Sequence, residues 1–206
     1  MAILPMFPLG TVLFPHMPLR LRVFEQRYLT MLSTVLQNDD PRFGVVLIER
    51  GQEVGGGEQR FPIGTVAEIT TLGTQDGFIG LLAQGTGRLR VEEWLPDDPH
   101  PRAEVTEVPE LAWDEQWRGL LAETERAVRR SLAVASEFSE QTWPADVGIE
   151  PDPVMATWQL AGVAPIGPLD QVGLLGARTG EELLTRLGRL CDETSSDLTA
   201  PWPDQS

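Results

Sequence analysis

The chain has 206 residues, of which 41% are hydrophobic, and it carries a formal net charge of −15 at pH 7. The hydrophobic content is enough to bury a core, so a globular fold is expected rather than a disordered chain. The charge disfavours binding to nucleic-acid phosphates and to anionic membranes, because both attract Lys and Arg.

All 16 basic residues are arginine, and the absence of lysine excludes several kinds of active site. A nucleotide-binding P-loop needs a lysine at the phosphates. A Ser–Lys catalytic dyad and a Schiff-base enzyme need one as well. We therefore expect a protein that is not an enzyme and that holds no cofactor. An enzyme whose active site has no recognisable motif is a third alternative.

The segment FPLGTVLFPHMPLRLRVFE, at residues 7–25, is apolar but contains prolines at 8, 15 and 18. Interior prolines break a helix, so this segment is not a membrane span. A secretory signal peptide needs basic residues before its apolar core, and the first basic residue here is Arg20. We expect extended chain broken by turns, in a soluble cytoplasmic protein.

Most of the first 110 residues show strand patterns. Five segments alternate or are rich in β-branched residues: 17–24, 42–49, 61–72, 78–94 and 101–108. The fourth is interpreted as two strands around a glycine turn near Gly85 and Gly87, with Arg88 and Arg90 pointing outward. A helix is predicted from Glu25 to Asn38.

Three consecutive glycines make GQEVGGGEQR, residues 51–60, a candidate flexible loop. The segment lacks the GxGxxG spacing and the following helix of a dinucleotide site, so no phosphate-binding role is assigned to it.

After about residue 111 the apolar period changes to that of helices. Trp113 and Trp117 are interpreted as the start of a long amphipathic helix. We expect both rings to bury against the β-rich half, the alternative being that they pack only against neighbouring helices. A short helix is expected at 169–175.

Two motifs predict helix starts in this half. Asp152-Pro153 places a capping acid before a proline at the first helical position. Thr179 and Glu182 have the spacing of a capping box. The helix that follows presents an apolar stripe that includes Cys191, which is expected to be buried, and the tail from about residue 195 is expected to fray.

The segment LPMFPLGTVLFPHMPLRLRVFEQRY, residues 4–28, is similar to the beginning of the Lon protease N-terminal, substrate-binding domain. That family has an LPLFPLG-type strand, an FPG turn and a PL-x-x-FE-x-RY passage. RFGVVLI at 42–48, IGTVAEI at 63–69 and LLAQGTGRLRV at 81–91 match in the family's order. WQLAGVAPIGPLDQVGLL, in the helical half, matches less closely.

This resemblance implies an α+β fold, with a PUA-like β-barrel over residues 1–110 and a small helical bundle over 111–206. It also implies a stand-alone, non-catalytic module that binds unfolded or partly unfolded protein or peptide clients, without the ATPase and protease of Lon. A protease or chaperone is a possible further partner. Because PUA-like folds include RNA binders, an RNA-binding protein is the alternative.

Phe7, Phe14 and Met17 flank the proline-rich turns and are the candidate peptide-binding residues. As an exposed apolar lip they would accept unfolded segments, whereas packed strand ends are the ordinary alternative. His16 stands where the family often has glycine, which suits a backbone position with positive φ. His16 and His100 lack the spacing of metal ligands, so no metal site is expected.

The RNA-binding alternative depends on two arginine pairs, Arg20 with Arg22 and Arg88 with Arg90. On outward strand faces they would form a basic surface. A solvated face with cross-strand partners such as Glu92 or Glu104 is the competing interpretation, and the net charge favours it.

Overall fold

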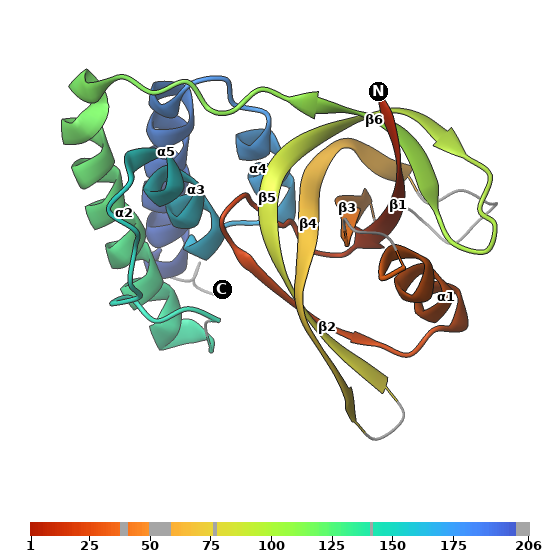
Figure 1. Cartoon of the computed structure of the whole chain (residues 1–206). Coiled ribbons are helices and arrows are strands. Elements are labelled where there is room, and N and C mark those ends of the chain that lie inside the picture. The colour runs from red at the N-terminus through yellow and green to blue at the C-terminus, as the bar shows by residue number, and fades with distance from the viewer. Residues whose placement is uncertain (38–40, 50–58, 76–77, 141, 201–206) are drawn as a thin grey trace, which may run out of the picture. The chain divides into compact units, whose positions relative to one another are not determined.

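The computed structural model describes residues 1–37, 41–49, 59–75, 78–140 and 142–200 (Figure 1). Residues 51–58 of the glycine-rich segment lie outside this description. The chain divides into two compact units, Met1–Glu110 and Leu111–Ser206. The strands and one helix form the first unit and the remaining helices form the second, in agreement with the α+β class expected from the sequence.

The first unit is a mixed sheet that closes on itself. Its strands are β1 (Ala2–Leu9), β2 (Pro18–Val23), β3 (Arg42–Glu49), β4 (Gln59–Gln75), β5 (Phe78–Leu95) and β6 (Arg102–Val108). The order is β2-β5-β4-β3-β1-β6, and β6 also pairs with β5, so all strands except β2 form a closed ring. Helix α1 (Gln26–Val35) connects β2 to β3.

Strand β1 closes the ring because it changes partner half-way along. Ala2–Pro5 pair antiparallel with β6, whereas Met6–Leu9 pair parallel with β3. Alternate side chains of the ring strands point inward. They form a core cluster of Met6, Val46, Val66, Leu89, Val91, Ala103 and Val105, against which Leu4 and Trp94 also pack.

The glycine turn predicted near Gly85 and Gly87 is wrong, because β5 runs without a break from Phe78 to Leu95 (Figure 1). A Cβ at Gly85 would overlap the Phe14 carbonyl oxygen, whereas Gly87 faces open space. The pairing register with β4 shifts beside these glycines, between Val66 and Ala67. Gly85 therefore allows close approach of another backbone, which is a common reason for glycine inside a strand.

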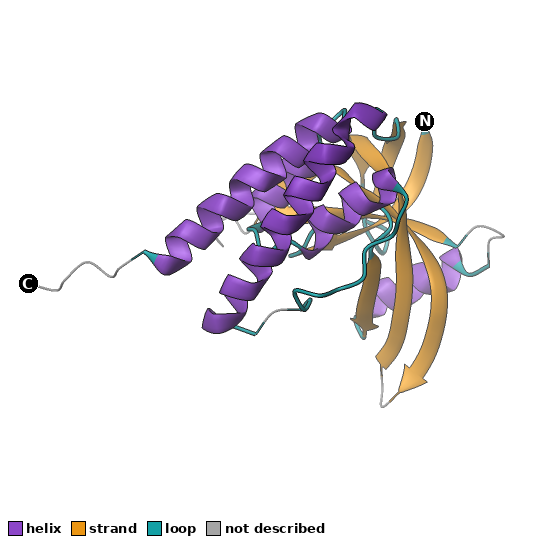
Figure 2. Ribbon diagram, turned by 90° about the vertical axis from the view of Figure 1, so that its left-hand side faces the viewer, coloured by secondary structure: helices purple, strands orange, loops and turns teal. Residues whose placement is uncertain are grey.

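The second unit contains the 3-10 turn η1 (Glu115–Trp117) and helices α2 (Arg118–Phe138), α3 (Pro153–Val163), α4 (Pro168–Leu175) and α5 (Gly180–Thr199). Helices α2 and α5 lie side by side (Figures 1 and 2). The Thr124 hydroxyl donates to the Leu184 carbonyl, 3.2 Å away, across that contact. Trp158 is fully buried, and so is Cys191, as predicted. No helix in the described ranges is long and apolar enough to cross a membrane.

Both predicted helix starts are confirmed. The Asp152 carboxylate accepts hydrogen bonds from the amides of Val154 and Met155, at 3.0 and 2.9 Å. The Thr179 hydroxyl accepts from the Glu182 amide. The Glu182 carboxylate accepts from the amide of Arg178 rather than that of Thr179, so the return bond of a standard capping box is displaced by one residue.

The two tryptophans after residue 111 differ from the prediction. Trp113 precedes the helix, and its ring meets that of Trp117 edge-on, at 5.8 Å between centroids. A Cβ on Gly180 would lie 2.7 Å from Trp113 and 3.3 Å from Trp117, so both rings contact the start of α5. This contact supports the alternative that they pack within the helical unit. At the other end of α5, residues 195–199 are helical rather than frayed.

Candidate peptide-binding site

The three residues predicted to form an apolar lip are buried. Phe7, Phe14 and Met17 are 8%, 1% and 7% exposed. Phe7 stacks on Tyr28 of α1, with 4.0 Å between ring centroids and an angle of 9°. Phe7 also packs against Phe43 of β3. The three residues form no exposed lip in this structure, and a direct role in peptide binding stays a prediction.

The turn between β1 and β2 is tied to the ring by main-chain hydrogen bonds. The His16 amide donates to the Gly85 carbonyl at 2.8 Å, and the Gly85 amide donates to the Met17 carbonyl at 2.9 Å. The buried Thr65 hydroxyl donates to the Leu13 carbonyl. His16 has φ 61°, which confirms the prediction that this position needs a left-handed backbone. These hydrogen bonds therefore hold the turn against strands β4 and β5 of the barrel.

The arginine pairs do not form one surface. Arg20, Arg22 and Arg90 are exposed. Arg88 is only 4% exposed, and its guanidinium donates to the Pro109 carbonyl at 2.5 Å. The prediction that Arg88 points into solvent is therefore wrong. The carbonyl that accepts its hydrogen bond follows directly after Val108, the residue of β6 that pairs with Arg88.

A pocket opens at one end of the closed ring, and we call it the barrel-mouth pocket. Its volume is about 260 Å³, and its lining residues are Met1, Ala2, Leu4, Arg42, Val66, Leu89, Val105, Thr106 and Glu107. Three of them, Val66, Leu89 and Val105, belong to the core cluster. The pocket therefore leads from solvent to apolar side chains of the barrel interior.

The start of β1 shapes this mouth. The two-residue period of a strand turns Ala2 and Leu4 toward the pocket and Ile3 away from it. Accordingly, Ile3 does not line the pocket and is 58% exposed. Figure 1 marks this end of the strand with N.

Farther along β5, the same core cluster is covered. Trp94 packs against the cluster, and the Arg60 guanidinium lies 4.5 Å from the centroid of its indole ring. Asp97 approaches Arg60 to 3.5 Å. This cation–π contact, with Asp97 as the carboxylate partner of Arg60, covers the Trp94 ring on this side of the barrel.

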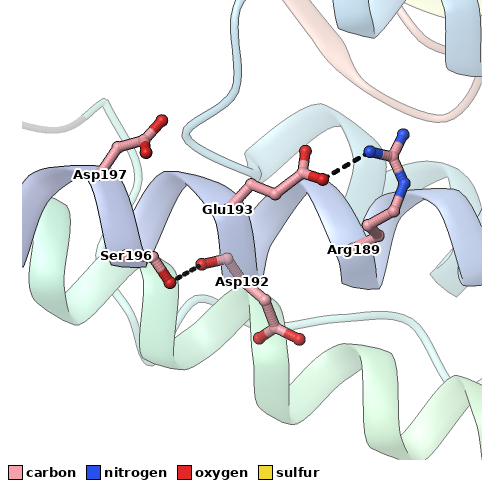
Figure 3. Close-up of a pocket in the computed structure, with 5 residues that line it drawn as sticks. All are labelled: Arg189, Asp192, Glu193, Ser196 and Asp197. Carbon is pink, nitrogen blue, oxygen red and sulfur yellow. Dashed lines mark hydrogen bonds and ion pairs between the residues drawn. The ribbon is translucent and has the colours of Figure 1, made fainter.

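A second hollow lies on α5 and is polar (Figure 3). Arg189 pairs with Glu193 at 2.6 Å, and the Ser196 hydroxyl donates to the Asp192 carbonyl at 2.8 Å. Figure 3 shows the carboxylates of Asp192 and Asp197 pointing in different directions. Pairs four residues apart are typical of a solvated helix face, and these groups do not converge on a common ligand position.

Cysteine and the possible metal ligands were two candidate sources of reactivity, and Cys191 is a buried free thiol. Burial raises the pKa of the Cys191 thiol to about 12, with a smaller contribution from Asp192. A thiol with such a pKa is neutral and unreactive at physiological pH. No group of three or more His, Cys, Asp and Glu among the described residues is placed to hold a metal ion. His100 is buried beside the Pro101 carbonyl.

Residues 3–192 match the family described as the ATP-dependent protease La (LON) substrate-binding domain. The chain belongs to the Lon substrate-binding domain family. It is 28% identical over 193 residues to Lon protease 2 of Herpetosiphon aurantiacus, covering 89% of this chain and 23% of that protein. It is 29% identical to Lon protease of Desulfosudis oleivorans, covering 65% and 17%. The chain thus spans about a quarter or less of the length of these relatives.

Solved structures give the same fold. A Lon N-terminal domain protein from Xanthomonas campestris matches with a TM-score of 0.66 and 25% identity, covering 91% of this chain and 97% of that one. The N-terminal domain of Lon protease from the Mycobacterium avium complex matches with a TM-score of 0.64 and 18% identity, covering 95% and 99%. The match is to the substrate-binding domain of Lon, and no ATPase or protease domain is matched.

Sequence patterns did not reveal the pocket of this Lon domain. Its lining comes from β1, β3, β4, β5 and β6, segments that meet only when the ring closes. Alternation in the segment 78–94, with Arg88 and Arg90 predicted outward, indicated that Leu89 points inward. Nothing in the sequence indicated that it faces an opening rather than a sealed core.

Proposed function

We propose that this Lon-type domain is a non-catalytic module that binds unfolded or partly unfolded protein segments. The observation that carries the proposal is the barrel-mouth pocket, an opening onto the barrel core. An apolar side chain of a client would enter the pocket and contact Val66, Leu89 and Val105. The family's description as a substrate-binding domain and the similarity to Lon proteases support the same function.

The size of the pocket suits a single side chain. Pockets for drug-sized ligands have volumes of about 300–1,000 Å³, and this one, at about 260 Å³, is smaller. Burying one large apolar side chain contributes about 1.5–3 kcal/mol. A dissociation constant of 1 mM corresponds to about −4 kcal/mol, so one such contact gives weak, reversible binding. Such binding suits transient holding of a client before its transfer to a protease or chaperone.

Filling the pocket tests the proposal. Ala2 is exposed at the mouth, so Ala2→Phe should occupy the opening without disturbing the core. Ile3→Phe is the matched control, because the neighbouring side chain points away from the pocket. We expect Ala2→Phe to weaken binding of a reduced, alkylated globular protein by roughly fivefold or more, as loss of an apolar contact would, while Ile3→Phe binds as the parent does.

Fluorescence anisotropy would measure the binding, and circular dichroism would verify that both variants are folded. Equal binding by the parent and by a folded Ala2→Phe would contradict a role for the pocket. Failure of the parent to bind the alkylated protein would contradict the function itself.

RNA binding is the less supported alternative, because Arg88 is buried and the chain carries net charge −15. A titration with single-stranded RNA at low salt should show no tight binding. Tight binding that weakens steeply with added salt would favour the RNA-binding alternative.

A further inference from the structure

Strand β2 has an unpaired edge. It is the end strand of the order β2-β5-β4-β3-β1-β6, and its only strand partner in the described ranges is β5 (Figure 1). The other five strands close into the ring without it, through the pairing of β5 with β6. Within the described part of the chain, therefore, no strand pairs with the far side of β2.

The pairing with β5 determines which main-chain groups lie at this edge. The Gly85 amide donates to the Met17 carbonyl, so alternate residues from Met17 to Val23 are the ones that bond to β5. The amide and carbonyl groups of Arg20 and Arg22 point to the opposite side. Neither residue forms a backbone hydrogen bond outside this pairing with any described residue. Donors and acceptors for a further strand are thus present.

The side chains of the same two arginines are exposed on one face of β2. Neither forms an ion pair with a described residue, although the Arg22 guanidinium lies 5.3 Å from the centroid of the Phe78 ring. Their opposite residues on β5, Leu82 and Gly80, carry no charge. Two positive charges without carboxylate partners therefore border the open edge.

We propose that the β2 edge binds an extended client segment as an added antiparallel strand, with acidic side chains opposite Arg20 and Arg22. Main-chain hydrogen bonds supply the affinity in this mode of recognition, and alternate side chains supply the specificity. Opposite charges that face each other across two strands stabilise the pair. This site goes beyond the proposed function of the barrel-mouth pocket, whose lining includes no residue of β2.

A second copy of this chain is a poorer occupant of the edge. Antiparallel pairing of two β2 strands about Leu21 would place Arg20 of one copy opposite Arg22 of the other, and like charges directly opposite are destabilising. Pro18 also lacks an amide hydrogen, as is common on edge strands. The arginines therefore discourage self-association and favour an acidic strand, which is how specificity commonly arises.

The charge of the whole chain opposes this preference at long range. A protein of net charge −15 repels acidic segments, but charges separated by more than about 8 Å are largely screened at physiological ionic strength. Opposite side chains on paired strands lie only about 4.5–5.5 Å apart at their Cβ atoms. The local arginines are therefore expected to decide the preference at about 0.15 M salt.

Three labelled peptides of equal length test the charge preference. They alternate Val with Glu, with Gln or with Arg, and fluorescence anisotropy at about 0.15 M salt measures their binding. We expect the Glu peptide to bind roughly threefold to tenfold more tightly than the Arg peptide, with the Gln peptide between them. Arg20→Gln/Arg22→Gln should reduce that ratio to less than about twofold. Arg126→Gln/Arg130→Gln on α2 removes the same charge from exposed residues and should leave the ratio unchanged.

Two N-methylated forms of the Glu peptide test strand addition itself. In the antiparallel arrangement the amides of the Glu residues donate to β2, whereas those of the Val residues face away. Methylation of the Glu amides should weaken binding by roughly tenfold or more, because it removes those hydrogen bonds. Methylation of the Val amides should have little effect.

Equal effects of the two methylations, or an equal loss of preference in both double variants, would overturn the inference. Weaker binding of the Glu peptide to folded Ala2→Phe would also overturn it, because the peptide would then occupy the barrel-mouth pocket. If no peptide bound while the parent still bound the alkylated protein, the inference would fall and the proposed function would stand.

Discussion

His16 holds a backbone conformation that side chains other than glycine adopt at a cost. Its φ is 61°, and its amide is fixed to the Gly85 carbonyl. The left-handed region costs an L-residue about 1–2 kcal/mol, while glycine's extra freedom in the unfolded chain offsets about 0.5–1 kcal/mol. His16→Gly should therefore raise the free energy of unfolding by up to about 1 kcal/mol. His16→Val should lower it by about 1–2 kcal/mol in urea denaturation, and a Val variant as stable as the parent would contradict this account.

Cys191 should be inert while the chain is folded. Because burial raises its pKa from 9.0 to about 12, iodoacetamide at pH 8 should leave the native protein unmodified and should alkylate it in urea. Between pH 9 and 12 the unfolded chain loses a proton that the folded chain keeps. The free energy of unfolding should thus fall with rising pH in that window, and less so in Cys191→Ala. Rapid alkylation of the native protein would show that the helical core opens readily.

At the scale of elements, β5 depends on one glycine and tolerates replacement of another. A Cβ at position 85 would overlap the Phe14 carbonyl oxygen, but a Cβ at position 87 would meet nothing within 4 Å. Gly85→Ala should destabilise the protein by about 1–3 kcal/mol, as overpacking does. Gly87→Ala is the matched control and should change stability by less than about 0.5 kcal/mol. Equal effects of the two substitutions in thermal unfolding would refute the packing explanation.

The start of α3 depends on one carboxylate. Asp152 accepts two main-chain hydrogen bonds there, so Asp152→Ala should cost about 1 kcal/mol of stability. Asp152→Asn keeps an acceptor oxygen and should cost much less. Chemical denaturation of the two variants measures the difference. If both lost the same stability, the hydrogen bonds would not be the cause.

Local signals predicted helix starts better than they predicted β5. Asp152-Pro153 and Thr179 act through neighbouring residues, so the sequence contains all the participants. Gly85 acts through Phe14, far away in the chain, and a glycine that permits close approach has the same local appearance as one in a turn. Arg88 likewise alternates as an outward residue, and its local sequence does not indicate that it is buried with a hydrogen bond to the Pro109 carbonyl.

The sequence predicted the candidate site less well than it predicted the strands. Phe7, Phe14 and Met17 were chosen because they are apolar residues beside turns. Their burial is decided by partners such as Tyr28, which the sequence places on another element. The barrel-mouth pocket needs five strands in register before it exists. Resemblance to the family predicted the fold and the family membership, and it did not indicate this opening.

At the scale of the whole molecule, net charge of −15 implies self-repulsion in the compact state. Raising NaCl from about 0.02 M to about 0.5 M shortens the Debye length several-fold. Such screening should raise the melting temperature by about 2–5 °C at pH 7. Near the isoelectric point of about 4.4 the same salt addition should have little effect. A melting temperature that falls with salt at pH 7 would instead indicate that attractive ion pairs dominate.

The change of pairing partner along β1, from β6 to β3, also affects how the barrel folds during synthesis. Ala2–Pro5 pair with Arg102–Val105, so the ring cannot close until about 100 more residues have left the ribosome. At about 5–20 residues per second that wait lasts on the order of 5–20 s. During synthesis the first strand is an open edge that could pair with a wrong neighbour. Pro5 and Pro8 lack the amide hydrogen that such pairing needs, so the strand that waits longest is also protected against premature partners.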